Sequence, residues 1–189
     1  MSGPVLLLPG VLAPADCERA IERAHALGLG TQRTHAASER RRAHVDDSDL
    51  AAKLWTTLAA HLPVLAAFYP RPLRPEPEAG ELSAWRPAGL SAFLRFYAYS
   101  PGERFPPHTD LAHEVSHDER TFLTVVLYLD EGCEGGETRF LDVDPPEVIR
   151  PRAGTALVFA HERRHEGVEV TSGVKHVLRT DVVFRRTSP

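Results

Sequence analysis

The sequence predicts a fold that is mainly β with α, an antiparallel double-sheet barrel with helical support. Two observations carry this prediction. In the first half of the chain, residues 14–27 and 48–62 place apolar side chains at helical spacing. From Ser91 onward, short apolar runs follow one another and are separated by Gly or Pro, as is typical of strands. Helices followed by a series of short strands indicate a barrel or double sheet with a helical buttress.

Length and composition favour a single domain over residues 1–189, with a hydrophobic fraction of 42% and a charged fraction of 25%. The net charge of −4 gives no reason to expect nucleic acid or an anionic membrane as a partner. The apolar run Val5–Leu8 is too short to span a membrane, and no basic segment precedes it as in a signal peptide. Cys17 and Cys133 imply no disulfide framework, which favours a cytoplasmic location.

The elements of the first half begin with a short strand over residues 5–8. Pro14 is expected to open the first helix and Gly28 to end it. The apolar face of this helix consists of Cys17, Ala20, Ile21, Ala24 and Leu27. The following polar stretch, residues 34–44, carries three consecutive arginines. We expect it to be a solvated edge or loop rather than an anion-binding patch.

The second helix is expected to have Ser48 as its N-cap and to break at Pro63. The proline-rich stretch 70–77 is expected to be a rigid loop, too short to link two domains. Residues 1–90 then form the helical support, and residues 91–186 form the barrel. The strands expected in the barrel are 92–99, 121–129, 137–141, 155–160, 166–170 and 175–184.

The most informative motif is His108-x-Asp110. If this segment is extended, the imidazole and the carboxylate point to the same side and can converge on one point. An iron(II) ion held by two histidines and one carboxylate needs such a pair and a second histidine, and it keeps open positions for chemistry. His113 and His117 could supply the second imidazole, but they lie in a polar stretch, residues 111–120, that is expected to be a loop.

Three later histidines are further candidates. His165 begins an expected strand, a rigid element that can fix a ligand, whereas His161 ends the preceding strand. His176 should point away from the face of its neighbour Lys175. Reasoning from the residues alone leaves this choice open.

Residues 93–184 resemble the catalytic domain of prolyl 4-hydroxylase-type iron(II)/2-oxoglutarate-dependent dioxygenases. The matching blocks, in order, are Tyr99-x-x-Gly102-x-x-Phe105-x-x-His108-x-Asp110; Arg120-Thr121-x-x-Thr124 with Leu127-Tyr128-Leu129-Asp130; Gly135-Gly136-Glu137-Thr138-x-Phe140; and Pro151-x-x-Gly154-x-Ala156-x-x-Phe159 followed by His165-x-Gly167-x-x-Val170-x-x-Gly173-x-Lys175. The resemblance implies a jelly-roll (double-stranded β-helix) core, with His108, Asp110 and His165 as the iron ligands. Two positions depart from the family: Phe105 stands where a tyrosine is frequent, and Asp181 where many members carry tryptophan.

The resemblance also implies the cofactors and their contacts. Fe(II), 2-oxoglutarate and O2 would be bound, with ascorbate as an optional reductant. Lys175 stands at the position that pairs with the far carboxylate of 2-oxoglutarate, and Tyr128 and Tyr99 match further contacts to this co-substrate. Thr138 is a weaker candidate for the pocket lining. Arg179 lies on the same face as Lys175 by strand alternation, so it is a second candidate for the carboxylate or a group on the substrate side.

The expected activity is oxidative decarboxylation of 2-oxoglutarate to succinate and CO2, coupled to hydroxylation of an unactivated C–H bond. Asp110 favours hydroxylation because related halogenases lack this carboxylate, although desaturation or ring formation is an alternative outcome. The substrate is expected to be a peptidyl proline, with a free amino acid or small metabolite as the alternative. A cupin-like barrel that binds metal without turnover is a further alternative. Residues 111–120 are expected to form a mobile flap over the substrate side of the site.

Overall fold

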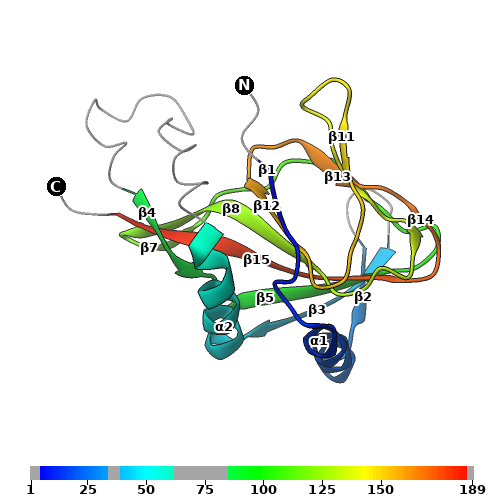
Figure 1. Ribbon diagram of the computed structural model, residues 1–189, viewed down its shortest axis with the longest axis horizontal. Helices are drawn as coiled ribbons and strands as arrows, with labels where there is room; N and C mark the ends of the chain where they lie inside the picture. Colours follow the sequence, from blue (N-terminus) through cyan, green and yellow to red (C-terminus); the bar gives the residue numbers. More distant parts are fainter. Residues whose placement is uncertain (1–4, 34–38, 62–84, 187–189) are drawn as a thin grey trace.

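Two antiparallel sheets face one another in the computed structural model, which describes residues 5–33, 39–61 and 85–186 (Figure 1). The larger sheet has the strand order β1 (Val5–Leu8), β12 (Ala156–Ala160), β8 (Glu119–Tyr128), β15 (Lys175–Arg186), β5 (Phe93–Tyr99), β3 (Glu39–Asp46) and β2 (Gly30–Arg33). Two short strands extend it, β4 (Trp85–Leu90) beside β15 and β7 (Glu114–Ser116) beside β8. The smaller sheet has the order β11 (Glu147–Ile149), β10 (Thr138–Phe140), β13 (His165–Gly167) and β6 (Phe105–His108). A separate pair joins β14 (Val170–Ser172) to β9 (Glu134–Gly135).

The predicted jelly-roll architecture is confirmed, and strand alternation divides the interior into two cores. On β5, Leu94 and Phe96 belong to a core that also contains buried residues of the helices, whereas Tyr97 and Tyr99 belong to a second core between the sheets. The second core consists of Tyr97, Tyr99, Tyr128, Phe140, Leu157, Phe159, Val170 and Val177. Because successive side chains of a strand point to opposite faces, one sheet can both bind the helices and line a barrel interior.

The two helices begin close to where the sequence predicts. Helix α1 (Pro14–Ala26) has proline in its first turn, and the chain leaves it at Gly28, whose φ of +70° is in the left-handed region. Helix α2 (Ser48–Leu58) continues into a 3₁₀ turn, η1 (Ala59–His61). Its N-cap is Asp47, whose Oδ1 accepts the N–H of Leu50 at 2.8 Å, so the expected Ser48 cap was wrong by one residue. Asp and Ser cap helices comparably well, and the sequence alone does not separate them.

Several expected loops are strands. The arginine run lies on β3, which pairs with β5 through Arg41 and Ala98, so the expectation of a loop is wrong for residues 39–44. Ala43 is buried in the helix-side core, and pairing with β5 decides the conformation of a segment whose composition looks solvated. Strand β4 lies within residues 1–90, so that region is not purely helical support. The expectations for Pro63 and for residues 70–77 lie outside the described residues.

Residues 111–120 also contain regular structure. Strand β7 pairs with the start of β8, with Glu114 opposite Arg120, so this stretch forms a hairpin rather than an unstructured loop. Its side chains are nevertheless largely exposed, and Leu111 is 77% exposed immediately after Asp110.

Candidate metal and co-substrate site

Two neighbouring strands of the smaller sheet bring the motif histidines together. His108 ends β6, His165 begins β13, and the two residues are direct partners in the antiparallel register. Asp110 follows β6, and its backbone N–H donates to the carbonyl of His161 at 2.9 Å. The three residues offer ligand atoms that all lie within 4.8 Å of one another. This arrangement of two imidazoles and one carboxylate could hold a divalent iron with positions left open.

Both imidazoles are oriented by the backbone. Nδ1 of His108 lies 2.8 Å from the carbonyl of Pro106, and Nδ1 of His165 lies 2.8 Å from the carbonyl of Arg163. An N–H at each Nδ1 donates to its carbonyl and leaves the Nε2 lone pair for a metal. Burial and the neighbouring His165 lower the pKa of His108 to about 4, and burial also lowers the pKa of His165. Neutral imidazoles are the form that binds a metal.

The carboxylate of Asp110 is held at both oxygens. Thr124 Oγ1 donates to Oδ2 at 2.5 Å, and Arg179 Nη2 donates to Oδ1 at 2.7 Å. Burial opposes ionisation, but Arg179, His165 and Thr124 outweigh it and lower the pKa of Asp110. The group is therefore an anion in a fixed orientation, as a metal ligand requires.

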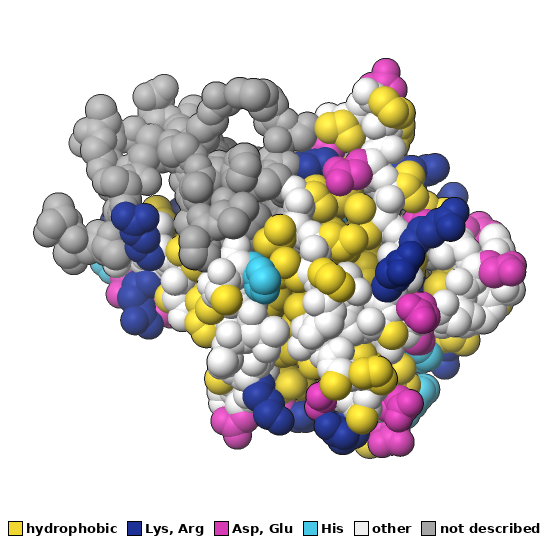
Figure 2. All heavy atoms as spheres, in the orientation of Figure 1, with side chains coloured by type: hydrophobic (Ala, Val, Ile, Leu, Met, Phe, Trp, Pro, Cys, Tyr) yellow, Lys and Arg dark blue, Asp and Glu magenta, His cyan; other side chains and the backbone are white. Residues whose placement is uncertain are grey.

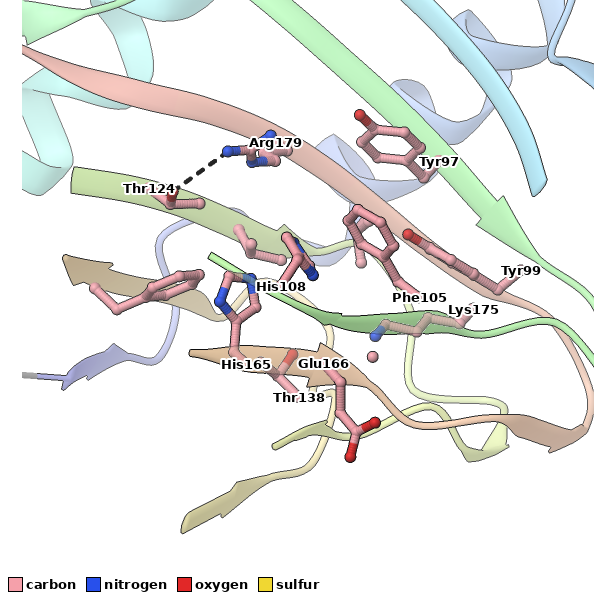
Figure 3. A pocket seen from close by; sticks show the side chains of 14 residues that line it. Tyr97, Tyr99, Phe105, His108, Thr124, Thr138, His165, Glu166, Lys175 and Arg179 are labelled. Atoms are coloured by element: carbon pink, nitrogen blue, oxygen red, sulfur yellow. Dashed lines mark hydrogen bonds between the residues drawn. The ribbon is translucent and has the colours of Figure 1, made fainter. Parts of the chain in front are cut away.

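A pocket opens beside this cluster, and Lys175 lies at its far side (Figure 3). Lys175 is 5% exposed, and its Nζ donates to the carbonyl of Gly136 at 2.5 Å. No carboxylate of the described residues lies within 4.0 Å of this ammonium, although Cys133, Glu137 and Asp130 act on it from farther away. Burial therefore dominates and lowers the pKa of Lys175 to about 8. A buried ammonium without a counter-ion fits the far carboxylate of 2-oxoglutarate.

The two tyrosines named from the sequence lie beside this lysine. The Nζ atom of Lys175 is 5.5 Å from the ring centroid of Tyr99 and 5.5 Å from that of Tyr128. Tyr99 lines the pocket. The hydroxyl of Tyr128 instead lies 2.7 Å from Thr138 Oγ1, and Thr138 lines the pocket. The phenyl ring of Phe105, where the family often has tyrosine, lies 3.8 Å from the His108 ring between centroids.

Arg179 faces the pocket as alternation predicts, but it has other partners. Besides Asp110, its Nη2 lies 3.5 Å from Asp181 Oδ1 and 3.4 Å from Thr124 Oγ1 (Figure 3). The cation of Arg179 is thus already compensated by carboxylates, and that of Lys175 is not. This contrast favours Lys175 as the partner of 2-oxoglutarate.

Sequence reasoning missed the polar network behind Asp110. Asp181 is 2% exposed, forms an ion pair with Arg95, and lies 3.3 Å from His161 Nε2. Burial opposes its ionisation, but His161, Arg179 and Arg95 outweigh burial and lower the pKa of Asp181 to about 2. Two signals in the sequence could have indicated this network. Asp181 stands where many family members carry tryptophan, and strand alternation places residues 179 and 181 on the same face. Contacts with Arg95 and His161 join distant segments, which a local pattern cannot reveal.

The remaining candidate histidines lie outside the ligand cluster. His161 contacts Asp181, and His176 is bonded to Asp130 through both its backbone and its ring. His113 Nδ1 lies 3.0 Å from Thr121 Oγ1, and His117 is exposed. The structure therefore groups only His165 with the His108–Asp110 pair among the described residues.

Comparison with solved structures shows the same fold in prolyl hydroxylases. The viral collagen prolyl hydroxylase of Paramecium Bursaria Chlorella virus-1, in its 2OG complex, has a TM-score of 0.66 at 18% identity, covering 98% of this chain and 96% of that chain. A prolyl-4-hydroxylase of Pseudomonas putida has a TM-score of 0.62 at 22% identity, covering 100% and 95%. A Trichoplax adhaerens prolyl hydroxylase, in complex with a hypoxia inducible factor peptide fragment, has a TM-score of 0.62 at 13% identity, covering 94% and 82%. No curated protein matches the sequence significantly.

Together, the fold and the His-Asp-His cluster define the class of 2-oxoglutarate-dependent dioxygenases. Residues 94–180 match the family model of the 2OG-Fe(II) oxygenase superfamily. The match covers just under half of the chain, and together with the His-Asp-His cluster it indicates Fe(II) and 2-oxoglutarate as the cofactors. None of the helices in the described part of the chain has the length and apolarity needed to cross a bilayer.

Proposed function

We propose that this dioxygenase hydroxylates an unactivated C–H bond in the manner of a prolyl 4-hydroxylase. His108, Asp110 and His165 would hold Fe(II), and Lys175 would bind the far carboxylate of 2-oxoglutarate. The observation that carries the proposal is that one pocket joins a His-Asp-His cluster to a buried ammonium without a carboxylate partner. Iron and 2-oxoglutarate, when bound, would supply the activation of O2, with one oxygen atom entering succinate as CO2 is released and the other becoming the hydroxyl group of the substrate.

The residues of the chain itself would bind and orient the metal and the co-substrate and exclude water from the pocket. Phe105, Val126, Phe159 and Val177 form apolar walls of the pocket, which raise the strength of the interaction between Lys175 and a carboxylate. The backbone carbonyls behind the two histidines hold the ligand nitrogens in place. The presence of Asp110 supports hydroxylation over halogenation, because the carboxylate takes the position that a halide would need.

A peptidyl proline is the first candidate substrate, because the similar solved structures are prolyl hydroxylases and one of them holds a peptide fragment. The second candidate is a free amino acid or small metabolite, and Arg179 in the pocket favours one that carries a carboxylate. A barrel without turnover is disfavoured because the ligand set and Lys175 are all present.

The test measures succinate from 2-oxoglutarate and, separately, binding of Fe(II) under nitrogen. His108→Ala, Asp110→Ala and His165→Ala are each expected to lose both. His176→Ala is the matched control, since this imidazole is bonded to Asp130 away from the cluster. It should bind iron and form succinate as the unmodified chain does. Retention of iron by His165→Ala together with its loss in His176→Ala would show that the ligand assignment is wrong.

A further inference from the structure

Arg179 and Lys175 form two separate cationic positions in one pocket. Both lie on the same face of β15, and four residues of strand separate them by about 13 Å between Cα atoms. Arg179 contacts Asp110 and Thr124, whereas Lys175 contacts Gly136. In Figure 3 the two side chains lie on opposite sides of His108. A single small diacid held by Lys175 therefore leaves Arg179 for another ligand.

The charges around the site do not balance once the cofactors are counted. The network behind the ligands contains two carboxylates, Asp110 and Asp181, and two guanidiniums, Arg179 and Arg95. These four charges cancel. Lys175 adds one positive charge, Fe(II) adds two, and 2-oxoglutarate removes two. Glu166 also lines the pocket, but it is paired with Arg139 at 2.6 Å. Among the groups in direct contact, the loaded site would keep one positive charge in excess, with Glu137 and Asp130 farther from Lys175.

Arg179 is compensated by carboxylates in the free protein, and a bound metal would compete for one of them. Its best partner, Asp110 at 2.7 Å, is the carboxylate that would also bind the metal, so Arg179 and a divalent cation share one anion. Its other carboxylate, Asp181 at 3.5 Å, is also paired with Arg95. The contacts with Asp110, Thr124 and Asp181 all involve one terminal nitrogen, Nη2, and the guanidinium, which carries five N–H donors, is also hydrogen-bonded to the side chain of Tyr97. The side chain is 18% exposed and lines the pocket, so a ligand can reach it.

We propose that Arg179 binds a carboxylate of the primary substrate, and that the substrate is therefore an anion. This inference rests on the proposed function and names the substrate class for the same site. The carboxylate is received beside Asp110, on the side of the metal cluster away from Lys175. A guanidinium binds a carboxylate in a fixed, forked geometry, so Arg179 also orients the substrate toward the metal.

The test uses Co(II) in place of iron, under nitrogen, with 2-oxoglutarate bound. Absorption of Co(II) reports binding without turnover. Propionate is the probe, and propionamide is its neutral control. Propionate is expected to give a saturable spectral change, with a dissociation constant at least tenfold lower than that of propionamide. Arg179→Gln should abolish this preference, and Arg179→Lys should restore part of it, because lysine keeps the charge and loses the fork.

The failure of this inference can be separated from failure of the proposed function. The spectral change caused by 2-oxoglutarate itself, before any probe is added, reports the proposed function. If 2-oxoglutarate binds and propionate shows no advantage over propionamide, the anion site does not exist. An advantage that persists in Arg179→Gln would also overturn the inference. If 2-oxoglutarate gives no change in the unmodified chain, the proposed function itself is wrong.

A second arm identifies the source of the carboxylate. N-acetylglycine presents a free acid of small size, and the capped tripeptide acetyl-Gly-Asp-Gly-amide presents the same group on a peptide. Tighter, Arg179-dependent binding of N-acetylglycine assigns a free acid as substrate. Tighter, Arg179-dependent binding of the tripeptide assigns an acidic peptide. Binding of both without dependence on Arg179 contradicts the proposal.

Discussion

Replacing Lys175 by methionine should make the free protein more stable while removing its co-substrate site. The ammonium is buried without a carboxylate partner among the described residues, and burial lowers its pKa from 10.5 to about 8. At about 1.4 kcal/mol for each pKa unit, keeping this group charged at pH 7 costs the folded state about 3 kcal/mol. Loss of its bond to the Gly136 carbonyl returns about 1 kcal/mol. Methionine has a similar length and fills the space, so Lys175→Met should gain about 2 kcal/mol in free energy of unfolding.

The pH dependence of this gain has a definite sign. The folded pKa of Lys175 lies below its unfolded value, so the charged form is disfavoured by folding. The cost is complete below about pH 8, shrinks as the pH rises, and vanishes above about pH 10.5, where the group is neutral in both states. Urea unfolding of both proteins at pH 7 and pH 10, without metal or 2-oxoglutarate, measures the difference. It should be largest at pH 7.

The same substitution should weaken 2-oxoglutarate binding by roughly 3–5 kcal/mol, or between two and four decades, because the buried co-substrate carboxylate loses its partner. Calorimetric titration of the Co(II)-loaded protein measures this loss, and the metal affinity serves as the internal control. If Lys175→Met is less stable than the unmodified chain at pH 7 and binds 2-oxoglutarate equally tightly, Lys175 is neither an uncompensated buried charge nor the partner of the co-substrate.

Four further outcomes are expected. The dissociation constant of 2-oxoglutarate should rise about tenfold per pH unit above about pH 8, because Lys175 loses its proton there in the free protein. In titrations from pH 7 to 9.5, Lys175→Arg should flatten this dependence. Thr124→Val should weaken Co(II) binding by about tenfold in a metal titration, because Asp110 loses a charge-assisted bond, and an unchanged constant would count against that role. Asp181→Asn should lower the free energy of unfolding in urea by roughly 3 kcal/mol, because two partly buried guanidiniums lose their shared buried anion; a change below about 0.5 kcal/mol would contradict this. Replacing residues 111–116 by a Gly/Ser linker should reduce formation of the hydroxylated product. The iron content, and the succinate released in the absence of substrate, should not change. An unchanged product yield would show that this hairpin is only a connector.

Much of the fold could be predicted because the strands that build the site have strong local patterns. The run containing Tyr128 is apolar and β-branched, and the turn at Pro101-Gly102 separates two elements clearly. Strand β3 could not be predicted, because its arginines look solvated and only pairing with β5 makes the segment extended. The capping choice between Asp47 and Ser48 likewise depends on a geometry that composition does not specify.

The candidate site could be located from the sequence where its residues lie close together along the chain or match a position of the family that the chain resembles. His108 and Asp110 share one motif, and the resemblance singles out His165 and Lys175. The network of Arg95, Arg179 and Asp181 was missed because its partners come together only when β5 and β15 pair. The resemblance gave no help there, since Asp181 departs from the family. The assignment of ascorbate as a reductant stays a prediction.

Isotope labelling shows directly whether this chain uses O2 to decarboxylate 2-oxoglutarate. The unmodified chain is supplied with Fe(II), 2-oxoglutarate and ¹⁸O2, and the succinate formed is analysed by mass spectrometry. We expect one labelled oxygen atom per succinate, with the second atom of O2 available to the substrate, and no succinate from His165→Ala. Succinate without label, or labelled succinate formed equally by His165→Ala, would contradict this expectation.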